Sequence, residues 1–145
     1  MTLEQLAPLL LVLPMAGFLL TALIGRRLGK QAHWIPVLAV FAVWLIAMGL
    51  VVNVLSGTAP LIPGTEDLHG YEIPLFTWIP AGEIQVEVGL FIDPLTACLL
   101  IVVTTIGLLV HVYSIGYMSH DPGYWRFFAY LNLFMFSMLL IVLAD

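Results

Sequence analysis

The sequence predicts an all-α membrane protein with four transmembrane helices and a small extramembrane β-hairpin between helices 2 and 3. Of its 145 residues, 62% are hydrophobic and only 9% are Asp, Glu, Lys or Arg, against roughly 25% charged residues in a soluble domain. Four spans of about 20 residues use roughly 80 residues, which leaves enough for turns and one sizeable loop. A soluble globular fold is therefore excluded, and we expect one membrane domain over residues 1–145.

Charge and cysteine content exclude two further classes of protein. The chain has four Lys and Arg residues and a formal net charge of −5, so it offers little to the phosphates of a nucleic acid. Cys98 is the single cysteine, so neither an intrachain disulfide nor a thiolate metal site can form within the chain. The partner that the composition itself predicts is the lipid bilayer.

The first two spans are expected at about 6–24 and 34–55. Basic residues follow the first apolar run rather than precede it, unlike a secretory signal, so we expect a retained helix. Gly17, Thr21 and Gly25 repeat every four residues along it and form a seam that lets another helix approach closely. The second run is interrupted only by Asn53 and is long enough to span with some tilt.

An acidic loop, 56–89, follows the second span. It holds five of the nine acids, Glu66, Asp67, Glu72, Glu83 and Glu87, and no Lys or Arg. Residues 83–88 alternate polar and apolar side chains, which predicts a strand with one wet face. Residues 71–80 are rich in aromatic and β-branched side chains but contain Pro74 and Pro80, which favours an edge strand or an interfacial segment. Together the two segments predict the hairpin.

The third and fourth spans are expected at about 94–113 and 127–144. Asp93 and Pro94 form a favourable helix start, because the aspartate accepts amide hydrogens at the N-cap and proline has none to satisfy. Every basic residue, Arg26, Arg27, Lys30 and Arg126, falls on one side of the spans. The positive-inside rule makes that side cytoplasmic and puts the N-terminus on the opposite side.

Ionisable groups inside a bilayer are costly and usually functional, and the sequence offers three weak candidates for a proton path: His111, Asp145 and Asp93. His111 ends a stripe on one face of the third helix. The stripe consists of Thr96, Leu100, Thr104, Gly107 and His111. Such a stripe is compatible with packing against a neighbouring helix, with the hydrogen-bonding groups of His111 satisfied near the cytoplasmic interface, or with a proton relay. Capping explains Asp93 without a role in ion entry, and Asn132 is expected to form an interhelical hydrogen bond.

Asp145 follows an unbroken apolar run. This ending leads us to expect that the 145 residues are part of a larger chain. A pump also needs a series of buried acids and bases, which four spans with one histidine do not provide.

The stretch from residue 89 to residue 145 resembles a known family through a series of segments in order and at matching spacing. The segments are GLFIDPLT at 89–96, VVTTIG at 102–107, HVYSIGYM at 111–118, DPGYWRFFAYLNLF at 121–134 and LAD at 143–145. They resemble the N-terminal portion of subunit L of the proton-pumping NADH:quinone oxidoreductase, respiratory complex I, an antiporter-like membrane subunit. Residues 1–87 match that family mainly in layout.

The resemblance implies a place in the membrane arm that couples quinone reduction by NADH to proton movement. In that family the proton-handling Glu lies on the helix after the position of Asp145, and lysines and a histidine follow on later helices. The resemblance therefore implies that this piece is structural, with no catalytic, cofactor-binding or metal-binding residue of its own. NADH, flavin, iron–sulfur and quinone sites are expected in other subunits, and the other membrane subunits of complex I are the expected partners.

Two other functions stay open at this stage. The homologous large component, called the A-type component, of multisubunit cation/proton antiporters shares the architecture but has no redox partners. A small four-helix membrane scaffold protein is the second alternative. The expected location is a bacterial inner membrane, with an organellar inner membrane as the alternative.

Overall fold

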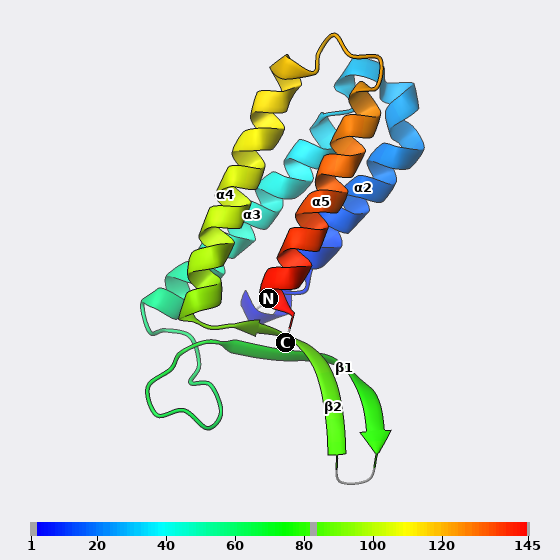
Figure 1. Cartoon of the computed structure of the whole chain (residues 1–145). Helices are drawn as coiled ribbons and strands as arrows, with labels where there is room; N and C mark the ends of the chain where they lie inside the picture. The colour runs from blue at the N-terminus through cyan, green and yellow to red at the C-terminus, as the bar shows by residue number, and fades with distance from the viewer. Residues whose placement is uncertain (1–2, 82–83, 145) are drawn as a thin grey trace.

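The computed structural model describes residues 3–81 and 84–144 as four long helices with a two-stranded hairpin at one end (Figure 1). The elements are α1 (Leu3–Leu6), α2 (Leu9–Leu28), the 3₁₀ turn η1 (Gly29–Gln31), α3 (Trp34–Leu55), β1 (Tyr71–Ala81), β2 (Ile84–Ile92), α4 (Pro94–Tyr117) and α5 (Tyr124–Leu143). The expected fold class, four membrane helices with a small hairpin between the second and third, is confirmed.

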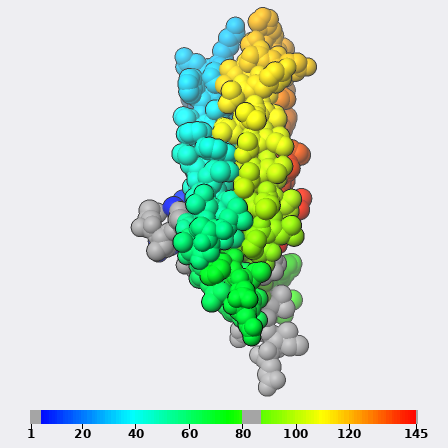
Figure 2. All heavy atoms as spheres, turned by 90° about the vertical axis from the view of Figure 1, so that its left-hand side faces the viewer, coloured from blue at the N-terminus to red at the C-terminus, as the bar shows by residue number. Residues whose placement is uncertain are grey.

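The long helices have the length and the surface of membrane spans. Each of the four is long and apolar enough to cross a bilayer. Large apolar side chains point outward along them, including Leu23 and Ile141, which are 76% and 80% exposed. Water would penalise so much exposed apolar surface, whereas lipid chains solvate it. The space-filling view shows α3 and α4 side by side along their length, with the loop that follows α3 below them (Figure 2).

The helices alternate in direction, and each packs on two neighbours. Helix α2 lies against α5 and α3, and α4 lies against α3 and α5 (Figure 1). Glycine makes the α2 contact close, because a Cβ at Gly17 would collide with the Asn132 amide nitrogen and would lie 3.0 Å from the Ala39 Cβ. At Gly25 a Cβ would lie 3.1 Å from the Trp125 Cβ. The small-residue seam expected in the first span therefore faces α3 and α5.

The hairpin is antiparallel and is joined to the helices at its base. Its register runs from Tyr71 opposite Ile92 to Ala81 opposite Ile84, with irregularities between Pro74 and Phe76 and between Thr77 and Ile79. Tyr71 and Ile92 are buried at the helix end. Pro74 is tolerated because both strands of a two-stranded sheet are edges, where a missing amide donor breaks little pairing. Of the two interpretations of residues 71–80, an edge strand or an interfacial segment, the edge strand is thus confirmed.

Three helix ends lie beyond the apolar runs of the sequence. Helix α2 ends at Leu28 rather than near residue 24, α4 ends at Tyr117 rather than near 113, and α5 begins at Tyr124 rather than near 127. The added turns carry basic and aromatic side chains, which are stable at the headgroup level of a bilayer. Hydropathy marks the hydrocarbon core, whereas the helical hydrogen bonds continue through the interface.

Replacing Gly17 by Ala is expected to destabilise the bundle, because the new methyl group has no space between α2, α3 and Asn132. Overpacking of this kind costs about 1–3 kcal/mol. Gly116→Ala is the matched control, since a Cβ at Gly116 on α4 meets nothing within 4 Å. Unfolding free energies measured by detergent titration should fall for Gly17→Ala and stay level or rise for Gly116→Ala. Equal losses in the two variants would contradict the close contact at Gly17.

Candidate functional site

The polar side chains buried between the helices are the candidate site in the membrane. They are Thr21, Thr104, His111, Ser114 and Asn132. Two of them bond to their own helix: Thr104 Oγ1 donates to the Leu100 carbonyl at 2.6 Å, and Ser114 Oγ donates to the Val110 carbonyl at 2.7 Å. Such bonds satisfy a hydroxyl without involving a second helix.

His111 and Asn132 join two helices. The Nε2 atom of His111 on α4 lies 3.2 Å from Oδ1 of Asn132 on α5, and both side chains are almost fully buried. The other ring nitrogen, Nδ1, lies 2.7 Å from the Gly107 carbonyl one turn earlier. The interhelical hydrogen bond expected of Asn132 is confirmed, and His111 is held at both nitrogens.

The Gly107 carbonyl decides the protonation of the histidine ring. A carbonyl only accepts, so Nδ1 must carry a hydrogen, and the Nε2 of a neutral ring is then an acceptor. The neutral ring fits its site when the Asn132 amide is turned so that Nδ2 donates to Nε2, because amide orientation is assigned from the hydrogen bonds it makes. The turn gives Nδ2 a partner and puts Oδ1 in its place beside Gly17, where one end of the amide has no hydrogen-bond partner among the described residues in either orientation.

Asp93 has the role of a helix cap. Its Oδ1 accepts the backbone amide of Thr96 at 2.7 Å, and Pro94 occupies the first turn of α4. The capping interpretation of the sequence is thus confirmed. Asp93 and His111 are 18 positions apart on one helix (111 − 93), roughly 27 Å at 1.5 Å per residue. The structure therefore does not bring these two candidates together. The third candidate, Asp145, lies outside the described residues.

Two further contacts between helices gave no signal in the sequence. Trp44 Nε1 of α3 donates to Thr105 Oγ1 of α4 at 3.1 Å. His33, which precedes α3, lies with Nδ1 2.9 Å from the Tyr124 hydroxyl at the start of α5. Each joins residues more than 60 positions apart, so spacing along the sequence could not have predicted the pairs. Together with the pair His111 and Asn132, these contacts tie neighbouring helices to one another.

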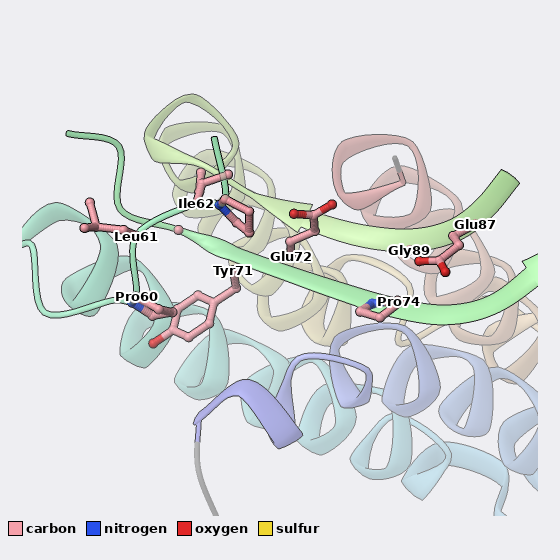
Figure 3. Close-up of a pocket in the computed structure, with 10 residues that line it drawn as sticks. Pro60, Leu61, Ile62, Tyr71, Glu72, Pro74, Glu87 and Gly89 are labelled. Atoms are coloured by element: carbon pink, nitrogen blue, oxygen red, sulfur yellow. The ribbon is translucent and has the colours of Figure 1, made fainter. Parts of the chain in front are cut away.

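Outside the helices, a hollow of about 380 Å³ lies between the hairpin and the preceding loop (Figure 3). Tyr71 and Glu72 of β1 and Glu87 of β2 line it, together with Pro60 and Pro74. Both carboxylates are exposed. Across residues 3–81 and 84–144, no three His, Cys, Asp or Glu side chains gather in a group that could hold a metal ion. The hollow shows no arrangement of a nucleophile, a base and a stabilising donor.

Comparison with known proteins relates the chain to one family. Residues 78–128 match the model of the family described as NADH-Ubiquinone oxidoreductase (complex I), chain 5 N-terminus. NADH-quinone oxidoreductase subunit L of Mycobacterium tuberculosis is 41% identical over 137 residues, 94% of this chain and 20% of the relative. NADH-ubiquinone oxidoreductase chain 5 of Dictyostelium citrinum is 39% identical over 138 residues, 93% of this chain and 19% of the relative.

The similarity extends to a chloroplast protein. NAD(P)H-quinone oxidoreductase subunit 5 of Mesostigma viride is 38% identical over 148 residues, which cover 99% of this chain and 22% of that protein. The chain thus spans about a fifth of the length of the curated relatives it matches. The resemblance to the N-terminal portion of subunit L is confirmed, and the similarity extends into residues 1–87, for which the sequence motifs gave only a similar layout.

The contacts of His111 predict a specific protonation pattern. In ¹⁵N-labelled protein in lipid at neutral pH, solid-state NMR should show Nδ1 protonated and Nε2 unprotonated. The variant His111→Gln identifies the signals by removing them, and Asn132→Leu should move the Nε2 resonance, because that atom loses its donor. An unprotonated Nδ1, or protonation of both ring nitrogens, would contradict the assignment.

Proposed function

Because the chain is similar over more than nine-tenths of its length to subunit L and chain 5 of NADH-quinone oxidoreductases, we propose that it serves in the proton-translocating membrane arm of such an enzyme. The similarity is the observation that carries the proposal. Four apolar helices and the matched segment at 78–128 agree with it. The whole enzyme would couple NADH:quinone electron transfer to proton movement.

Within that enzyme, these residues form a structural part rather than a catalytic centre. In the part of the chain that the structure describes, His111 is the only buried side chain among Asp, Glu, Lys, Arg and His. It is held by Gly107 and Asn132, so its contacts are those of a packing residue. A route for protons through a membrane needs a series of such groups, and His111 has no second one beside it on α4. A relay role for His111 stays a prediction.

The proposal extends to cofactors, partners and orientation. NADH, flavin, iron–sulfur and quinone sites belong to other subunits, and the chain's direct partners are neighbouring membrane subunits. The end of the bundle that holds Arg26, Arg27, Lys30 and Arg126 faces the cytoplasm, or the matrix side in an organelle, by the positive-inside rule. The hairpin and its acidic residues then face the opposite side.

The test is affinity purification of the tagged protein from native membranes in a mild detergent. We expect it to bring down flavin and iron–sulfur subunits, seen by flavin fluorescence and electron paramagnetic resonance, with NADH:quinone reductase activity sensitive to a quinone-site inhibitor. A tagged unrelated protein of the same membrane is the control. A complex of membrane subunits with neither flavin nor iron–sulfur clusters would support a cation/proton antiporter instead and would overturn the proposal.

A further inference from the structure

The basic residues of the chain gather at the end of the bundle opposite the hairpin. Arg26 and Arg27 lie in the last turn of α2, Lys30 lies in η1, and Arg126 lies near the start of α5 (Figure 1). The described carboxylate on this side is Asp121, which accepts the Gly123 amide. This end therefore carries a positive field at the level where phospholipid headgroups lie in a bilayer.

One of these four cations lines a groove. A hollow of about 270 Å³ lies between α2 and α5, and it is bounded by Phe18, Ala22, Trp125, Arg126, Ala129 and Tyr130. The small side chains of the two alanines leave the space open, and the three aromatic side chains form its apolar walls. No carboxylate of the described residues lines the groove. Arg126 is exposed at its mouth. The groove thus pairs apolar walls with a single positive charge.

The packing of α2 on α5 fixes the position of that charge. Gly25 of α2 leaves room for Trp125, whose Cβ lies 3.1 Å from where a Cβ on Gly25 would be. The Arg126 guanidinium carbon lies 5.2 Å from the centroid of the Trp125 ring, within the range of a cation–π contact. A second hollow adjoins at Trp125, but it is lined by the Asp121 carboxylate as well as by Lys30. Arg126 is therefore the cation that the α2–α5 groove offers to an anion.

The depth of the side chains matches one kind of ligand. Arg126 lies near the start of α5, and Ala129 and Tyr130 follow about one turn deeper; on α2, Ala22 and then Phe18 lie at successive turns into the membrane. A phospholipid has the same order, with a phosphate at the interface and an acyl chain below it. We propose that the α2–α5 groove is a binding site for one anionic phospholipid, with its phosphate on Arg126 and its upper acyl chain against Ala22 and Ala129.

The charge favours an anionic lipid over a zwitterionic one. A basic residue near the membrane surface attracts an anionic headgroup by about 1 kcal/mol, which corresponds to a preference of about fivefold. A zwitterionic headgroup brings its own cation close to Arg126 and loses most of that attraction. The site is independent of the redox partners proposed above, since it uses only residues of α2 and α5.

Native mass spectrometry of the full chain tests the proposal. The protein is released from nanodiscs that contain equal amounts of phosphatidylglycerol and phosphatidylcholine, and the bound lipid is counted. We expect one retained phosphatidylglycerol, preferred about fivefold, and loss of that preference in Arg126→Gln. Arg27→Gln is the matched control, because it removes one positive charge from the same end of the bundle and Arg27 does not line the groove. Its preference should stay within twofold of the unaltered protein.

A second variant distinguishes the effect of the groove's shape from the effect of its charge. Ala22→Phe fills the groove and leaves all four basic residues in place, so it should lose the retained lipid while the protein stays folded by circular dichroism. Equal effects of Arg126→Gln and Arg27→Gln would show a diffuse surface charge and overturn the site. Retention of the lipid by Ala22→Phe would also overturn it. The unaltered protein alone gives a decisive result, since equal retention of the two lipids contradicts the proposal even if a variant fails to fold.

Discussion

The bundle depends on one buried amide that must be satisfied inside the membrane. Asn132 on α5 is fully buried, bonds to His111 of α4 on one side and lies against Gly17 of α2 on the other. A bilayer core offers no water to an amide, so an unsatisfied one costs several kcal/mol and the protein has to supply the partners. The contact with His111 therefore fixes where α5 meets α4, the absence of a side chain at Gly17 lets α2 approach Asn132 closely, and the position of α3 follows from its packing on α2 and α4.

Lipid gives helices little hydrophobic reason to associate, so close packing and hydrogen bonds decide their arrangement. Glycines supply the close packing between α2 and α5, and the pair Trp44 and Thr105 supplies a hydrogen bond between α3 and α4. The same packing shapes the surface, because Gly25 seats Trp125 and Trp125 in turn holds Arg126 beside the groove. Packing inside the bundle and the proposed lipid contact outside it thus share one set of residues.

Local sequence patterns predicted the spans, the hairpin and the cap at Asp93, because hydropathy, period-two alternation and capping act over a few neighbouring residues. They could not supply partners that lie far apart in the chain. Asn132 was expected to bond to another helix, but its choice of His111 and its contact with Gly17 depend on how three helices pack. The family resemblance came from residues 89–145, and its extension to residues 1–87 required comparison with whole relatives.

A double-mutant cycle between His111 and Asn132 tests the central claim most directly, which is that this pair holds α4 against α5. Unfolding free energies are measured in detergent for His111→Leu, Asn132→Leu and the double variant. The contact predicts a coupling free energy of about 1 kcal/mol, typical of a hydrogen bond between membrane helices. A parallel cycle between His111 and Trp44, which share no hydrogen bond, should be additive. Additive losses for His111 and Asn132 would contradict the account.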